Sequence, residues 1–537
     1  MCYICVEFFY IISGAKDITT ATLEDLVILA PHQYSEKLGR QVKKILKNDF
    51  GFTNINLIDS KKYYKIQKGK RENGLITFED HERGNALDLS VLNQMKGKYV
   101  SIIHETRVYD PNDLVASNPH VLTADFFHLL EKARDARAQR ISWAVPKTSH
   151  EWSHQFLKNL WKYDEHQAKA LDQLIFNLST HRLDAYINVH PHGPREGVWY
   201  TNNYGLERFI EINPQTKDRV NGIAIEGNNI MLDLLKSTRH KKRKFNRLSS
   251  PFSYYLKILK GEIQDKNYFR DMFNENIDQI KEVGNYKRET TFFVAPDFGA
   301  IPNTQDFAEL HDYDYVISLK ARTDEGQTTI LHGADIQEIF KDREDININE
   351  KLYIPDLSSK LNNLAKSTKK TTLKLIIMDD KINSGGTAND EAALRRNQVQ
   401  EWMTNYNNDK PENEHVEYNV EIELWATHLR QPDLDQLKLY KEPEYIDKII
   451  LLDTVNYVPS LIEEIKKRNM EDRVRIIPAA AYQLAKGIAI DYLMHQNPNL
   501  DPTPFDLKVE KAKKRAYYDT LRPVGENPPH IPLKFKN

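Results

Sequence analysis

Two adjacent acids followed by a glycine-rich loop form the strongest chemical signal in the sequence. The segment LKLIIMDDKINSGGTAND (373–390) reads as a hydrophobic strand that ends in Asp379 and Asp380, then a short loop, then the start of a helix. Gly385 and Gly386 let the backbone approach a ligand and direct consecutive N–H groups towards it. Because the N-terminus of a helix favours an anion, this loop is a candidate phosphate cradle.

The side chains around the cradle restrict the class of ligand that it could bind. Ser384 and Thr387 add hydroxyl donors, and the lysine of a P-loop is missing, so the loop is not a Walker A motif. Paired carboxylates just upstream suit the vicinal hydroxyls of a sugar, or a magnesium ion. A phosphate cradle beside a pair of acids describes a site for a pentose 5-phosphate. The alternative is a glycine turn after a buried strand.

Short apolar runs alternate with longer amphipathic segments and supply the elements that would position this loop. Nearly continuous hydrophobicity over five to seven residues is typical of strands buried on both faces of a parallel sheet. Helical patterns follow several runs, for example at 35–46 and 459–468. The alternation predicts an α/β fold with parallel sheets. The apolar runs are 26–31, 98–105, 141–146, 184–190, 290–297, 314–320, 373–380, 421–428, 447–454 and 474–479.

The apolar runs fall into two groups, which predicts four regions. Residues 1–212 form an N-terminal α/β domain, and residues 290–497 form a C-terminal α/β domain that carries the phosphate loop. Between them, 213–289 reads as a helical and partly basic insertion, and 498–537 reads as an extended tail. The basic run HKKRK inside the insertion is typical of a solvated face.

Composition excludes several classes of protein. The 537 residues suit two to four domains, and 75 basic residues against 77 acidic ones give a formal net charge of -2. This balance argues against a nucleic-acid partner bound by bulk charge. No apolar run reaches the roughly 18–20 residues of a membrane span, so no membrane partner is expected. With only Cys2 and Cys5, the chain cannot be held by disulfides, which favours a cytoplasmic location.

Several segments of the sequence together resemble a known family. The segment IIMDDKINSGGT resembles the phosphoribosyl-diphosphate motif of type I phosphoribosyltransferases, and further segments resemble ribose-phosphate pyrophosphokinases in the same order along the chain. The resemblance implies two type I phosphoribosyltransferase domains with parallel sheets flanked by helices, and assembly into homo-oligomers. The further segments are ISWAVP (141–146), INVHPHG (187–193), FFVAPDFGA (292–300), VISLKAR (316–322), LWATH (424–428) and IILLDTVNYVP (449–459).

The resemblance assigns roles outside the phosphate loop. Lys320 and Arg322 match the catalytic K-x-R of the family, which stabilises the transferring phosphoryl groups. Such cations suit the chemistry, because negative charge spreads over phosphate oxygens as the bond transfers. His190 and Asp297 match ligands of magnesium and ATP, and strand carboxyl ends are where α/β sheets place ligands.

Within the loop, the resemblance places Asp379 and Asp380 on the ribose hydroxyls. The matched 5-phosphate loop comprises Asn383, Ser384, Gly385, Gly386 and Thr387. The chain departs from the family at Asn383, where the family has an aspartate. It also departs at 151–154, where the family's A-R-Q-D run is absent and the adenine-stacking arginine is lost. Trp152 can stack on adenine in its place.

The sequence therefore predicts an ATP-dependent, magnesium-requiring pyrophosphokinase that acts on small molecules. It would transfer diphosphate from ATP to the anomeric hydroxyl of ribose 5-phosphate and form phosphoribosyl diphosphate. The same chemistry on ADP-ribose, for NAD salvage, is one alternative, since Asn383 lowers the charge beside the 5-phosphate. The others are a phosphoribosyltransferase and a catalytically silent regulator associated with a synthetase.

Overall fold

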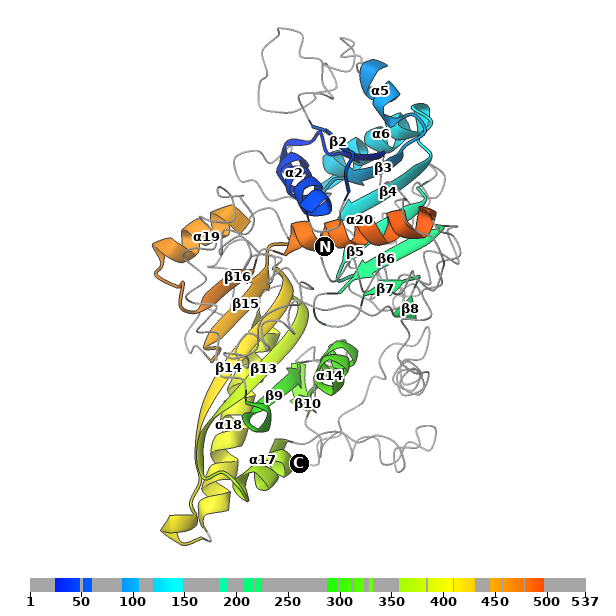
Figure 1. Cartoon of the computed structure of the whole chain (residues 1–537). Helices are drawn as coiled ribbons and strands as arrows, with labels where there is room; N and C mark the ends of the chain where they lie inside the picture. The colour runs from blue at the N-terminus through cyan, green and yellow to red at the C-terminus, as the bar shows by residue number, and fades with distance from the viewer. Residues whose placement is uncertain are drawn as a thin grey trace.

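The residues that the structure describes form two large, mostly parallel sheets, each covered by helices (Figure 1). The structure is a computed structural model. It describes residues 25–48, 52–59, 89–105, 119–147, 183–191, 206–213, 215, 218–221, 223–224, 287–296, 300–310, 313–322, 328–331, 357–382, 385–408, 410–429, 445–454, 458–477 and 479–496.

The first sheet has eight strands in the order β2-β1-β3-β4-β5-β6-β7-β8. Strands β1 to β6 pair in parallel, while β7 and β8 continue the edge in antiparallel fashion. The strands are β1 (Leu26–Leu29), β2 (Ile55–Ile58), β3 (Tyr99–Ile103), β4 (Arg140–Val145), β5 (Ala185–Val189), β6 (Arg208–Ile212), β7 (Arg219–Val220) and β8 (Ile223–Ala224).

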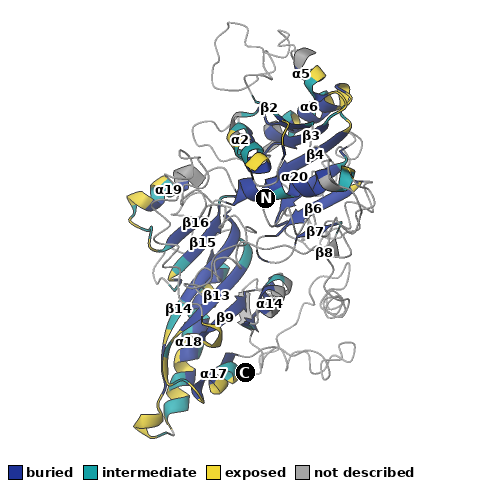
Figure 2. Ribbon diagram, viewed as in Figure 1, coloured by how far each residue is buried: buried dark blue, intermediate teal, exposed yellow. Residues whose placement is uncertain are grey.

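Helices cover both faces of this sheet, because its central strands are apolar on both sides. One face packs against α2 (Gln33–Asn48) and α20 (Ala480–Gln496). The other packs against α5 (Leu89–Met95) and α6 (Pro119–Asp135). The buried strands lie between these layers in Figure 2.

The second sheet has six strands, all parallel, in the order β10-β9-β13-β14-β15-β16. A separate pair, β11 (Leu319–Arg322) and β12 (Thr328–Leu331), is antiparallel. The strands of the main sheet are β9 (Thr291–Ala295), β10 (Asp314–Ile317), β13 (Lys370–Ile382), β14 (Glu417–Leu429), β15 (Lys448–Leu452) and β16 (Val474–Ile477).

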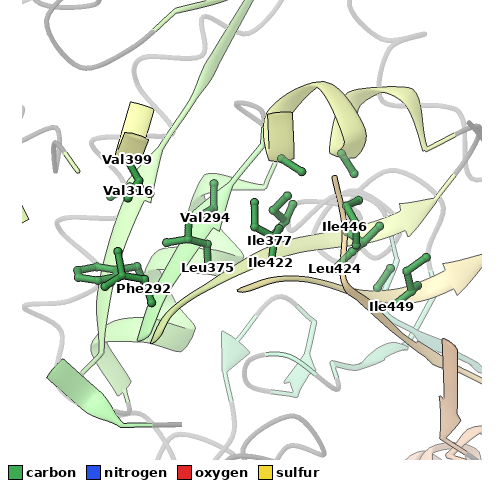
Figure 3. Packing of buried hydrophobic residues seen from close by; sticks show 14 of the residues in the cluster. Phe292, Val294, Val316, Leu375, Ile377, Val399, Ile422, Leu424, Ile446 and Ile449 are labelled. Carbon is green, nitrogen blue, oxygen red and sulfur yellow. The ribbon is translucent and has the colours of Figure 1, made fainter. Parts of the chain in front are cut away.

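Both faces of the second sheet are also covered. The larger core lies against α17 (Leu357–Ala365), α18 (Gly386–Asn408) and α19 (Val458–Lys467), and Figure 3 shows part of its packing. The smaller core lies against α14 (Ile301–Leu310). Two short 3-10 helices, η1 (Arg288–Thr290) and η2 (Glu412–Glu414), precede β9 and β14.

Helix α20 crosses from the second half of the chain onto the first sheet, where Figure 1 shows it beside α2. Its approach to β5 is so close that a Cβ at Gly487 would lie 2.3 Å from Ile187 Cγ2. Asp491 of this helix is fully buried and accepts hydrogen bonds from Arg140 and Arg208 of the first sheet. By its packing, α20 thus belongs to the first sheet although it lies within 290–497.

The predicted fold class, α/β with two mostly parallel sheets flanked by helices, is confirmed. Two details differ from the sequence analysis. Strand β13 continues through the acid pair to Ile382, because β14 pairs with it along this whole length. The described start of 213–289 adds strands β7 and β8 to the first sheet, and helices are absent from that described part.

The domain boundaries stay a prediction, and 498–537 lies outside the described residues. Within the part of the chain that the structure describes, no helix combines the length and apolarity that a membrane crossing needs.

Candidate functional site

The acid pair and the start of α18 are close together in the chain, and together they make up the local unit of the candidate site. Asp379 and Asp380 are partly exposed near the end of β13. Gly385 is buried and has φ +74°, a left-handed conformation that favours glycine. Its carbonyl accepts the N–H of Asn389 at 2.9 Å, so α18 begins directly at Gly386. The first N–H groups of α18 have no partner within the helix, which suits an anion.

Two predicted members of the loop, Asn383 and Ser384, lie outside the described residues. Gly385, Gly386 and Thr387 lie at the turn into α18, as the sequence analysis predicted for a strand, loop and helix. Their role in phosphate binding stays a prediction.

The carboxyl ends of the two sheets meet at this unit. Three contacts or close approaches join them, each between a strand end or following loop in the first half and one in the second half. The pairs are His190 with Thr427, Gln215 with Asp379, and Glu105 with Asp453. Parallel α/β sheets place ligands at the carboxyl ends of their strands, so the junction between the halves is the natural position for a site.

His190 directly follows β5 and is held by the second half of the chain. Its ring Nδ1 is 2.5 Å from Thr427 Oγ1, and its Nε2 is 3.0 Å from Asn303 Nδ2. Because an amide nitrogen donates, Nε2 of His190 is the acceptor and carries a lone pair, while Nδ1 holds the proton. The residue is buried and has φ +49°, a strained conformation for a non-glycine residue, of the kind that clusters at functional sites.

This histidine also lies close to the acid pair. Asp379 is the register partner of Ala426 on β14, and Thr427 is the next residue along that strand. His190 therefore contacts the second sheet one residue beyond the partner of Asp379. The structure brings these two predicted site residues to the same junction.

His428 fixes the backbone of the same histidine. Its Nε2 is 3.1 Å from Val189 O and 3.2 Å from His190 O, and carbonyl oxygens only accept, so Nε2 donates. Its Nδ1 is 2.7 Å from Oγ1 of Thr454, which follows shortly after β15. The end of β5 is thus tied to both β14 and β15.

The predicted K-x-R lies on the separate hairpin of the second half. Lys320 and Arg322 are on β11, where they are register partners of Ile330 and Thr328 on β12. The structure describes their backbone and not their side chains. Their catalytic role stays a prediction.

The base of this hairpin is anchored to α18, the helix that follows the predicted phosphate loop. Ser318, just before β11, is fully buried and donates to Glu391 Oε1 at 2.5 Å. Arg395, one turn further along α18, donates to the same carboxylate at 2.7 Å and also to Ser318 Oγ. A single helix thus begins at the candidate cradle and holds the start of the hairpin.

Buried carboxyl groups lie beside the junction. Burial, with a smaller effect from the nearby Asp453 carboxylate, raises the pKa of Glu105 to about 8. Burial also raises the pKa of Asp453 to about 6, although the N–H groups of Ala479 and Ala480 donate to it at 2.5 and 2.8 Å. Glu105 is thus protonated at neutral pH, and Asp453 caps the N-terminus of α20.

Two histidines at the ends of β1 and β3 are neutral. Burial lowers the pKa of His32 to about 3 and that of His104 to about 4. His104 Nε2 is 2.7 Å from Leu122 O, and its ring lies edge-on to His32 at 5.2 Å. These side chains are part of the packing under α6.

The predicted metal and nucleotide sites are only partly described. Asp297 and Trp152 lie outside the described residues, so His190 is the described member of both predicted sets. Within the described residues, no three His, Cys, Asp or Glu side chains gather to hold a metal ion. Magnesium and ATP therefore stay predictions.

Four residues of this junction are absent from the predicted site: Gln215, Asn303, Thr427 and His428. Thr427 and His428 lie in the LWATH segment, whose position at a strand end was the available signal. Gln215 follows the short strand β6, and Asn303 lies in the first turn of α14. Neither has a recognisable motif around it, since its contact is made across the two halves of the chain.

Comparison with known proteins finds no matching protein family and no matching curated protein. Among solved structures, the chain is similar to phosphoribosylpyrophosphate synthetase from Mycobacterium smegmatis, with a TM-score of 0.43 and 12% sequence identity. The alignment covers 89% of this chain and 100% of that chain. A likeness at this level does not assign a function.

Proposed function

We propose that the chain is a pyrophosphokinase that uses ATP and the 5-phosphate of a ribosyl group. The anomeric oxygen of the acceptor forms a bond to the β-phosphorus of ATP. The bond between that phosphorus and the bridging oxygen to the α-phosphorus breaks, and AMP leaves with the electron pair. The anomeric proton is released, and the product is phosphoribosyl diphosphate.

The observation that carries this proposal is the junction of His190 with the acid pair. Two carboxylates near the end of β13 precede a helix N-terminus, and the other half of the chain contacts β13 and β14 at the same end. A reaction between a sugar phosphate and a second phosphorylated substrate needs a place where both can bind side by side, and a junction between two halves offers one binding surface on each half. This geometry supports a two-substrate transfer at the junction better than a single-ligand site.

Different residues would have different roles in the proposed reaction. The N–H groups at Gly386 and Thr387 would bind the 5-phosphate of the acceptor. Asp379 and Asp380 would accept hydrogen bonds from its hydroxyls and orient the anomeric oxygen for attack. Lys320 would neutralise charge on the transferring phosphates, a role that needs a cation in a site that excludes water.

Magnesium would enter with ATP and neutralise phosphate charge. His190 Nε2, which accepts a hydrogen bond from Asn303, is a ring nitrogen of the kind that can serve as a metal ligand.

The test measures AMP release from ATP in the presence of magnesium and ribose 5-phosphate. We expect Lys320→Ala to lower kcat by about 10²–10³-fold, as loss of one preorganised charge at a transition state does. The matched control is Lys370→Ala at the far end of β13, where the lysine is exposed and pairs with Glu417. AMP release that is equally fast in both variants would contradict the role of Lys320.

The alternative acceptor is ADP-ribose, which Asn383 favours because it lowers the negative charge beside the 5-phosphate. The same assay decides, with ADP-ribose in place of ribose 5-phosphate. Turnover with ADP-ribose and none with ribose 5-phosphate would change the acceptor while leaving the chemistry intact. No AMP release with either acceptor would refute the proposal and favour a phosphoribosyltransferase or a regulator.

A further inference from the structure

Gln215 is a fully buried glutamine on the loop that follows β6, at the junction of the halves. Hydrogen bonds join the described residues of this loop to one another. Asn213 Oδ1 accepts the N–H of Gln215 at 2.9 Å, and Asp218 Oδ1 accepts the N–H of Asn213 at 2.9 Å. Asp218 is in turn paired with Lys486 of α20. The position of Gln215 is therefore set by the first sheet and its helix.

The side chain of Gln215 reaches the acid pair in the second half. Its Nε2 is 2.7 Å from the backbone oxygen of Asp379. Because a carbonyl oxygen only accepts, the amide nitrogen must face Asp379 and the orientation of the amide is settled. The first half of the chain thus holds the residue at which the acid pair begins.

The other end of this amide is unsatisfied. Gln215 Oε1 is buried and has no hydrogen-bond partner among the described residues. A buried acceptor without a partner is costly, whereas an apolar side chain of the same length would not carry that cost. An unpaired buried acceptor on a side chain that contacts the backbone of the acid pair points to a donor that arrives with a ligand.

We infer that Gln215 is a binding residue for the sugar acceptor, whose hydroxyl donates to Gln215 Oε1 while Nε2 holds the carbonyl of Asp379. The inference rests on the proposed function, because it assigns the ligand class, a pentose 5-phosphate with free ring hydroxyls, to the same junction. The carboxylates of Asp379 and Asp380 accept from other hydroxyls of the ring. Gln215 would therefore contribute to selection for ribose over deoxyribose.

The test compares binding of ribose 5-phosphate with that of its 2-deoxy and 3-deoxy analogues by calorimetry on the full chain. Loss of the hydroxyl that Gln215 binds leaves its Oε1 unpaired. We therefore expect wild-type protein to bind one analogue about 10-fold more weakly than ribose 5-phosphate. Gln215→Met has a similar length and no amide. It should weaken ribose 5-phosphate and reduce that discrimination to less than about 3-fold.

The matched control is Gln41→Met on α2, whose amide nitrogen is also buried and has no hydrogen-bond partner among the described residues. It should leave both affinity and discrimination unchanged. Thermal unfolding of each variant confirms that it is folded.

The outcomes separate the two proposals. If Gln215→Met weakens all three sugars by the same factor, or none of them, Gln215 does not contact the sugar and the inference fails while the proposed function stands. If wild-type protein binds none of the three pentose phosphates, the proposed function fails and the inference falls with it.

Discussion

Asp491 is expected to be the residue on which the docking of α20 depends most. It is fully buried, and Arg140 donates to it through Nε at 3.0 Å and Nη2 at 2.9 Å. Arg208 Nη1 donates at 2.5 Å, and the hydroxyl of Tyr99 donates as well. Asp491→Asn keeps the shape and removes the charge, so two buried guanidinium groups lose their main counter-charge.

The magnitude follows from this burial. Removing one partner of a buried ion pair costs about 3–5 kcal/mol, because the remaining charge stays desolvated. The asparagine oxygen still accepts one hydrogen bond, and Glu207 remains at 2.6 Å from Arg140, although its side chain is 55% exposed. Both compensations favour the lower end of this range, so we expect Asp491→Asn to lower the free energy of unfolding by about 3 kcal/mol.

The assay is urea unfolding of the full chain at neutral pH, followed by the same measurement as pH falls. Burial alone would raise the pKa of Asp491, but the hydrogen bonds and charge of Arg140, with the charge of Arg208, outweigh it and hold that pKa below its ordinary value. A depressed carboxyl pKa stabilises the fold above the unfolded pKa of about 3.9. The gap between wild type and variant should therefore be constant at neutral pH and shrink below about pH 4.

The control is Asp472→Asn, whose side chain is 96% exposed and lies 3.9 Å from Arg475. It should change the unfolding free energy by no more than about 0.5 kcal/mol. A loss below about 1 kcal/mol for Asp491→Asn, or a gap that does not change in acid, would refute the view that this buried charge holds α20 on the first sheet.

Two further predictions concern the junction and the packing of α20 against β5. In the folded chain Glu105 keeps its proton to about pH 8, while an unfolded glutamate loses it at about pH 4.3, so the free energy of unfolding should fall between these values by up to about 1.4 kcal/mol per pH unit. In urea unfolding measured across this pH range, Glu105→Gln should flatten the slope and the exposed Glu417→Gln should not. An unchanged slope in Glu105→Gln would contradict the buried proton. In Gly487→Ala the added Cβ would lie 2.3 Å from Ile187 Cγ2, so the clash should cost about 1–3 kcal/mol of unfolding free energy, offset by about 1 kcal/mol of better helix propensity. In calorimetric unfolding, the double variant with Ile187→Ala should be less destabilised than the sum of the two single variants. Strict additivity would exclude the clash.

The central strands could be predicted because their signal is local. In β3, β4, β9 and β15, apolar side chains point to both faces, so a continuous hydrophobic run suffices to identify them. Strand β6 was missed, since Arg208 and Glu211 interrupt its sequence. Both are buried only because α20 and β7 bring Asp491 and Arg219 to them.

The candidate site divides in the same way. The strand, acids, glycine turn and helix around Asp379 and Gly385 are consecutive in the chain, so their arrangement follows from neighbouring residues. His190 and Thr427 are 237 positions apart, and Gln215 and Asp379 are 164 apart. Such contacts depend on how two finished sheets pack, and no local pattern records them.

The sequence by itself determined the α/β class, the positions of the central strands along the chain and the glycine turn after β13, because each depends on side chains a few residues apart. The tertiary structure decided that α20 completes the first sheet, that Glu105 lies near Asp453, and that Gln215 reaches Asp379. These features arise from burial between segments distant in the chain, where the partner of a polar group is known only once the halves are packed together.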